Sequence, residues 1–136
     1  MRTQIEIKTP GRGLHEVTDL VRDAVRDSGV RDGLCCVYLR HTSASLVIQE
    51  NADPSAARDL EQWFDAIAPD AHPSYTHTAE GPDDMPSHIR AAITRTTESF
   101  IVADGDLVRG TWQGLFLFEH RHAPHRRRLD ILILAG

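Results

Sequence analysis

The sequence lacks the features that mark several large classes of protein. It holds only two cysteines, Cys35 and Cys36, and their adjacency suits neither a disulfide framework nor a Cys-x-x-Cys zinc or redox motif. Its apolar runs are far too short to span a bilayer, and no apolar stretch follows the first residues as in a secretory signal. With 15 Lys+Arg against 20 Asp+Glu, it lacks the excess positive charge of a general nucleic-acid binder. We therefore expect a reduced, cytoplasmic protein that binds neither membranes nor nucleic acid.

What the chain does have is the composition of a folded domain. Hydrophobic residues make up 40% of its 136 residues and charged residues 26%, which argues against disorder. This length suits one domain, so we expect residues 1–136 to fold as a single unit. Histidine is unusually frequent, with eight residues. Because histidine is a common metal ligand and a general acid or base near neutral pH, a search for function begins with these side chains.

Apolar periodicity predicts strands and helices in mixed order. One helix is expected over 14–28, a second from Asp53-Pro54 to the residue before Pro69, and a third opened by Pro86 with Ile89 and Ile93 facing inward. Strands are expected over 3–9, 34–39, 46–48, 99–103, from 107 onward, 115–118 and 129–134, the last two joined as a hairpin by 119–128. This order favours an α+β fold, a single compact domain with about three helices and a mostly antiparallel sheet.

A long polar segment, residues 70–84, separates the second and third helices. Loops of this length in a compact domain are usually functional or disordered, and the histidines and carboxylates in this one favour a function. His77 and His88 flank three carboxylates at a spacing that matches no stock zinc motif, so a metal site needs a third ligand, for which His41 is the candidate. Three neutral imidazoles would leave an open fourth position, as in catalytic zinc sites. The alternative is a solvated acidic loop in which Asp84 caps a helix.

Two further segments could carry chemistry. His41 is followed by two hydroxyl residues at a strand end, where they could bind metal or phosphate or could simply be hydrogen-bonded within the scaffold. Asn51 and Asp53 also fit turn and helix-cap roles. Glu119 ends an apolar strand, so it is either solvated or a buried acid with a partner.

The arginine cluster 126–128 is a candidate phosphate clamp, because guanidinium groups match phosphate oxygens. The alternative for most of the cluster is a solvated hairpin tip, and the same default applies to His120, His122 and His125. Arg128 is the exception, because it begins a strand and could point inward beside Glu119.

Taken in order, these segments resemble the YjbQ family, also named the secondary thiamine-phosphate synthase family. The matching residues are His41–Ala44, Asn51–Pro54, Tyr75 with His77, Pro82–Ile89, Gly110–Gly114, Glu119–Arg121 and Arg128 with Gly136. The resemblance implies a compact α+β domain with a β-sandwich-like sheet. It also implies a homotrimer with the histidine site near subunit contacts, and a metal held by His41, His77 and His88. The activity it implies is a low thiamine-phosphate synthase activity, which joins a pyrimidine methyl pyrophosphate to a thiazole phosphate.

The candidate residues then fall into three groups. We assign His41, His77 and His88 to a divalent transition metal, zinc foremost. The catalytic candidates are Glu119, Asp84 and Asp53, and the candidates for binding substrate phosphate are Ser43, Asn51, Gln113, Arg121 and Arg128. The favoured function is a metal-dependent enzyme that acts on a small phosphorylated metabolite. A metallohydrolase of unknown substrate and a non-catalytic trimeric metal- or ligand-binding protein stay open as alternatives.

Overall fold

The structure is a computed structural model that describes residues 1–136. Two antiparallel sheets and three helices form an α+β domain, as the sequence predicts. No helix in it is both long enough and apolar enough to cross a membrane. In chain order the elements are β1 (Arg2–Thr9), β2 (Gly13–Glu16), α1 (Thr18–Ser28), β3 (Gly33–Leu39), β4 (Ala44–Glu50), α2 (Pro54–Ile67), α3 (Asp84–Ile93), β5 (Thr97–Ala103), β6 (Asp106–Leu107), β7 (Gln113–Glu119) and β8 (His125–Ala135).

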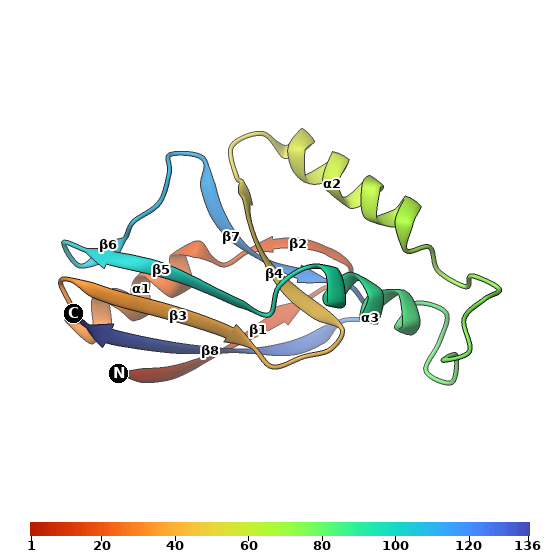
Figure 1. Ribbon diagram of the computed structural model, residues 1–136, viewed down its shortest axis with the longest axis horizontal. Coiled ribbons are helices and arrows are strands. Elements are labelled where there is room, and N and C mark those ends of the chain that lie inside the picture. Colours follow the sequence, from red (N-terminus) through yellow and green to blue (C-terminus); the bar gives the residue numbers. More distant parts are fainter.

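The hydrophobic core lies between the two sheets and α1. The larger sheet has the strand order β1-β8-β3-β5-β6, and the smaller has the order β2-β7-β4. Because alternate residues of a strand face opposite sides, β8 buries Leu129, Ile131 and Ile133 while Leu132 stays exposed. In Figure 1, β3 ends near the middle of the view, and β8 begins and α3 lies to the right of that point. Polar segments from distant parts of the sequence therefore share this side of the molecule.

The predicted hairpin between the last two strands is wrong. β7 pairs with β2 and β4 in the smaller sheet, whereas β8 pairs with β1 and β3 in the larger one. The segment after Glu119 therefore carries the chain from one sheet to the other. Both strands contribute to the same core from opposite sides, so adjacency in the sequence does not mean pairing here.

The first helix starts later than its apolar spacing predicts. Leu14 lies in β2, where it pairs with Phe118, and α1 begins only at Thr18. Sheet pairing thus overrides the helical periodicity of this segment. The predicted end is confirmed, because Gly29 has a left-handed backbone with φ 72° and caps the helix.

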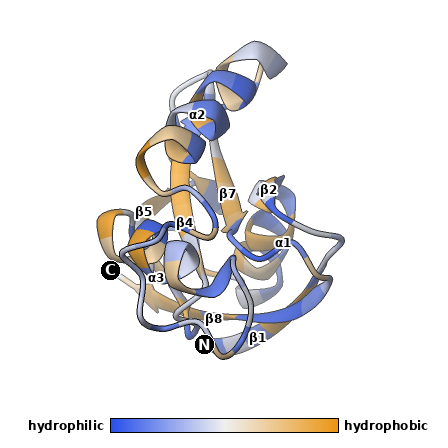
Figure 2. Cartoon of the chain, turned by 90° about the vertical axis from the view of Figure 1, so that its right-hand side faces the viewer, coloured by the Kyte–Doolittle hydropathy of each residue, from blue (hydrophilic) through white to orange (hydrophobic).

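α2 projects from the body of the molecule (Figures 1 and 2). Its apolar stripe consists of Ala57, Leu60, Phe64 and Ile67, and only Phe64 of these is buried, with its ring in an edge contact with Phe118 at a centroid distance of 5.2 Å. Ile67 is 42% exposed and Trp63 56% exposed. The helix bounds are as predicted, but the stripe has little of the chain to pack against.

α3 begins at Asp84, two residues before the predicted start at Pro86. Its buried side is largely polar and includes Asp84, Ser87 and Arg90, whereas Ile93 is 54% exposed. The prediction that Ile93 faces inward is therefore wrong. A short helix with a polar buried side is held by hydrogen bonds and ion pairs rather than by an apolar stripe.

Candidate metal centre

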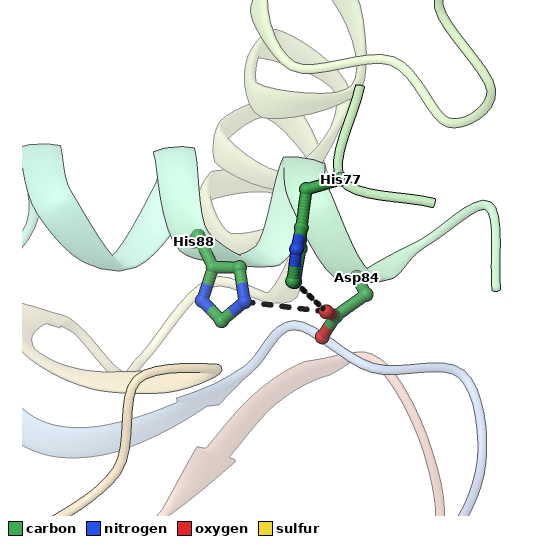
Figure 3. Close-up of side chains that lie close together, drawn as sticks. All are labelled: His77, Asp84 and His88. Carbon is green, nitrogen blue, oxygen red and sulfur yellow. Dashed lines mark hydrogen bonds and ion pairs between the residues drawn. The ribbon is translucent and has the colours of Figure 1, made fainter. Parts of the chain in front are cut away.

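Two histidines and one aspartate converge at the start of α3. His77 lies in the loop before α3, Asp84 is the first residue of α3, and His88 follows about one helical turn later. Figure 3 shows both rings directed at the carboxylate of Asp84. His77 Nε2 lies 2.7 Å and His88 Nε2 3.3 Å from Asp84 Oδ2. One potential metal-ligand atom from each residue lies within 4.8 Å of the other two.

The other oxygen of Asp84 is held by Arg121. Arg121 Nη1 donates to Asp84 Oδ1 at 2.7 Å, and Arg121 Nη2 donates to the carbonyl oxygen of Glu80 at 2.9 Å. Asp83 lies beside the same guanidinium and accepts a hydrogen bond from the His122 backbone N–H at 2.8 Å. Burial raises the pKa of Asp83, but these donors outweigh burial and keep its pKa below the ordinary value. Asp84 is thereby fixed with one oxygen facing the two rings.

The hydrogen bond on the far side of the His88 ring determines what its Nε2 can do. His88 Nδ1 lies 3.0 Å from the carbonyl oxygen of Thr42, which can only accept, so Nδ1 carries the proton. In a neutral ring the Nε2 lone pair then faces the carboxylate oxygen of Asp84. Two lone pairs in contact repel each other. The geometry therefore suits a cation placed between the His88 ring and Asp84.

His41, the predicted third ligand, lies outside this cluster. Its Nε2 accepts a hydrogen bond from the Arg128 backbone N–H at 2.8 Å. Burial, and then the positive charge of Arg127, lowers the pKa of His41. The structure thus places Asp84, which the sequence suggested as a base or as a partner of the ligands, beside His77 and His88. His41 is connected to them only through its neighbour Thr42.

Glu119 is fully buried in a closed ion pair. Its carboxylate accepts hydrogen bonds from the Thr9 hydroxyl, from Arg127 Nε at 2.7 Å and from Arg127 Nη2. Two backbone N–H groups, of His120 and Arg121, donate to it as well. Burial raises the pKa of Glu119, but the bonds from Arg127 and Thr9 outweigh it and lower the pKa. A carboxylate with five donors is held as an ion, which suits a structural role better than proton transfer.

The arginine beside Glu119 is Arg127, not the predicted Arg128. Arg127 is 4% exposed, whereas Arg128 points to solvent. The side-chain alternation of β8 explains the difference, because Arg127 is in phase with the buried Leu129 and Ile131. Arg127 Nη2 also donates to the carbonyl oxygen of Ser43 at 3.2 Å, which places Ser43 at this end of the molecule.

Three other candidate residues lie at the opposite end of the smaller sheet. Asn51 and Asp53 follow the end of β4, which pairs with the start of β7 at Gln113. Glu119 is at the other end of β7, about 20 Å away at about 3.3 Å per residue. Within one chain, Asn51, Asp53 and Gln113 are therefore separated from the histidine cluster.

Each of these three side chains has a local hydrogen bond. Asp53 Oδ1 accepts from the Ser55 backbone N–H at 2.9 Å, which is the capping role and lowers the pKa of Asp53. The other two bonds run from Asn51 Nδ2 to Glu16 Oε2 at 3.0 Å and from the Gly110 N–H to Gln113 Oε1 at 2.8 Å.

His120 is not the solvated residue that the sequence suggests. It is fully buried, with Nε2 2.8 Å from Ser45 Oγ and no partner for Nδ1. Burial, followed by the positive charges of nearby arginines, lowers its pKa to about 3, so the ring is neutral. It follows a strand that is buried on both faces, and that continuous apolar run was the available signal.

A polar hollow of about 480 Å³ also escaped the sequence analysis. Arg12, Asp70 and His122 line one side of it, with Asp70 bonded to Arg12 Nη2 and to His122 Nε2 at 2.8 Å each. Burial raises the pKa of Asp70, but the hydrogen bonds from Arg12 and His122 outweigh burial and keep this pKa below its ordinary value. Arg12 and Asp70 come from distant segments that no sequence motif connects.

The chain is similar throughout its length to one family of proteins. A family model described as "UPF0047 protein YjbQ-like" matches residues 3–135. A UPF0047 protein of Synechocystis is 50% identical over 92% of this chain and 85% of its own length. UPF0047 protein YjbQ of Escherichia coli O157:H7 is 42% identical over 94% of each chain. A crystal structure of an uncharacterised YjbQ/UPF0047 family protein of Clostridium acetobutylicum superposes with a TM-score of 0.88 at 34% identity, over 97% of this chain and 99% of that one.

Proposed function

Because the chain belongs to the YjbQ-like UPF0047 family, we propose the function that its histidine cluster and the family resemblance together support. The protein is a metal-dependent enzyme that acts on a small phosphorylated metabolite, and His77, Asp84 and His88 bind the metal. The specific reaction to assay first is thiamine-phosphate synthesis, as a main or a secondary activity. The single observation that carries the proposal is the convergence of His77 Nε2 and His88 Nε2 on one oxygen of Asp84.

The ligand chemistry supports a transition metal. Two imidazole nitrogens and one carboxylate oxygen suit zinc, and three protein ligands leave a position for water or substrate. Such an ion would act as a Lewis acid or lower the pKa of a bound water. Arg121 holds Asp84 from behind, and the carbonyl of Thr42 fixes the ring of His88. These are the outer contacts that orient metal ligands in proteins.

The same ligand set favours a second candidate function. Two histidines with one carboxylate form the zinc site of several hydrolases, in which a metal-bound water attacks the substrate. A metallohydrolase would use the cluster without a diphosphate leaving group. The two functions differ in whether a pyrimidine methyl pyrophosphate and a thiazole phosphate are joined or one phosphorylated compound is cleaved.

We also propose a cytoplasmic homotrimer. Asn51, Asp53 and Gln113 lie about 20 Å from the other end of β7, so they reach the histidine end only if a neighbouring copy supplies them. Exposed apolar residues offer surface for such a contact, Trp63 and Ile67 on α2 and Leu34 and Ile101 on the larger sheet. Sedimentation that shows a stable monomer at micromolar concentration would contradict this assembly.

The metal proposal is tested by metal analysis of the purified full chain after equilibration with zinc. We expect about one ion per chain in the wild type, with a large loss in His77→Ala, His88→Ala and Asp84→Asn. His72→Ala is the matched control, because His72 lies in the same loop and its side chain forms hydrogen bonds only with Ser74. Wild-type protein that binds no metal, or equal loss in the control, would overturn the site.

Two further measurements complete the test. His41→Ala separates the proposed set of His77, Asp84 and His88 from the predicted set of three histidines. Retained metal favours Asp84 as the third ligand, and lost metal favours His41. Turnover is then assayed with the thiazole phosphate plus the pyrimidine pyrophosphate, and with each compound alone. Joining of the two compounds supports the synthase, and cleavage of either compound alone supports the hydrolase. Metal binding without turnover of any phosphorylated metabolite contradicts the proposal that the protein is an enzyme.

A further inference from the structure

A basic hollow lies where the ladder between β1 and β8 ends. It has a volume of about 230 Å³ and is lined by Lys8, Thr9, Pro124, His125 and Arg126. Two of these side chains are permanent cations, one is a histidine, and none is a carboxylate. In a chain with a formal net charge of −5, such a lining stands out. None of these residues belongs to the histidine cluster described above.

The sheet register sets two like charges against each other. Lys8 lies directly opposite Arg126, so the two side chains emerge on the same face of neighbouring strands. Like charges in this position destabilise a sheet, and neither side chain takes part in an ion pair. Further along β8, by contrast, Asp130 is paired with Arg40 at 2.8 Å. Neither charge is therefore paired within the chain.

His125 also lines the hollow, although its place in the strand is in phase with Arg127 rather than with Arg126. Its Nδ1 lies 2.7 Å from the carbonyl oxygen of Ala123, which can only accept, so Nδ1 carries the proton. Its Nε2 has no hydrogen-bond partner in the chain. The neighbouring Arg127 points into the core and is saturated by Glu119, so it does not contribute.

We propose that this hollow binds the phosphate group of a small ligand through Lys8 and Arg126. An anion between Lys8 and Arg126 removes the repulsion that their register imposes and accepts charge-assisted hydrogen bonds from both. At about 230 Å³ the hollow is smaller than the roughly 300–1,000 Å³ of sites that enclose whole organic ligands. It therefore holds one anionic group and leaves the remainder of the ligand outside. The proposal does not depend on a metal at His77.

The composition of the chain provides a specific probe. Lys8 is its only lysine, so an amine-acylating reagent has two targets, Lys8 and the N-terminal amine of Met1. The Met1 amine donates to the carbonyl oxygen of Ile133 at the other end of β1 and serves as an internal reference. We expect inorganic phosphate to slow acylation of Lys8 severalfold, measured by mass spectrometry at constant ionic strength, and to leave Met1 acylation unchanged.

Variants make the test specific. Arg126→Gln should weaken phosphate binding by about tenfold or more, because a charge-assisted hydrogen bond is lost. Arg2→Gln is the matched control, since Arg2 lies at the far end of β1 and does not line the hollow. Calorimetry with inorganic phosphate measures the affinities, and circular dichroism shows that each variant is folded.

The outcomes separate clearly. Protection of Lys8 alone, lost in Arg126→Gln and kept in Arg2→Gln, supports the proposal. A phosphorylated metabolite that protects better than inorganic phosphate identifies a group carried by a larger ligand, whereas equal protection identifies free phosphate. Three outcomes would overturn the proposed phosphate site. They are equal effects on Lys8 and Met1, no protection of Lys8 at any phosphate concentration, and protection only by a nucleic-acid polyanion.

Discussion

Two clusters of ionisable side chains lie at the same end of the molecule and differ in how their hydrogen bonds are completed. Around Glu119 every lone pair meets a donor, and the Glu119–Arg127 pair is sealed from solvent. Around Asp84 one oxygen is satisfied by Arg121, while the other faces two imidazoles, one with its lone pair exposed to the carboxylate. A complete network stabilises a fold, whereas an incomplete one invites a cation. The comparison supports a structural role for the first cluster and the proposed metal-binding role for the second.

The largest expected effect on stability comes from breaking the Glu119–Arg127 cluster. Glu119→Gln leaves the buried guanidinium of Arg127 without a counter-charge, which should lower the free energy of unfolding by about 3–5 kcal/mol. Chemical denaturation measures this loss. Asp130→Asn is the matched control, because it breaks an exposed pair with Arg40 and should cost about 1 kcal/mol or less. If Glu119→Gln were as stable as the control, the Glu119 network would not be structural.

The cluster of His77, Asp84 and His88 should instead be stabilised by metal binding. Zinc at about a hundredfold excess over its dissociation constant should raise the free energy of unfolding by about 2.7 kcal/mol. Asp84→Asn should abolish this increase, whatever it does to the stability of the metal-free protein. Thermal unfolding of each protein with and without zinc isolates the difference. A similar increase in both proteins would place the metal elsewhere.

His120 should make the free energy of unfolding depend on pH. Its folded pKa of about 3 lies below the ordinary value of 6.5, so only the unfolded chain binds a proton between these values. The free energy of unfolding should therefore fall as the pH decreases below about 6.5, by about 2 kcal/mol at about pH 5. Urea denaturation above about pH 6.5 and at about pH 5 measures this loss, and His120→Gln is the comparison. An equally steep loss in that variant would assign the effect to other groups, among them His41.

The comparison also separates what periodicity predicts from what it cannot. The strand over residues 129–134 was predicted, and extending its alternation by two residues makes Arg127 the buried arginine. That signal was in the sequence. The hairpin error is different, because apolar strands of two facing sheets carry the same pattern as paired strands.

The candidate metal site was predictable in part for a similar reason. His77 and His88 stood out by residue type and by their place in a long polar loop. The partner that faces both depends on where α3 begins and on how Arg121, from a distant segment, orients Asp84. These are tertiary contacts, which a pattern of spacing does not contain. The same holds for Arg12 and Asp70 and for the opposition of Lys8 and Arg126.

The smallest effect concerns Asp53, which lies far from both clusters and caps α2. Asp53→Ala removes the acceptor for the Ser55 N–H and should lower Tm by a few degrees, whereas Asp53→Asn keeps an acceptor and should leave Tm nearly unchanged. Turnover of the same two variants separates the roles of this residue. A cap alone predicts normal turnover in Asp53→Asn, because the amide preserves the helix. If that variant folds normally but loses turnover, its carboxylate acts in catalysis. Since Asp53 lies beyond the reach of the histidines within one chain, the residue would then belong to a site completed by a second copy.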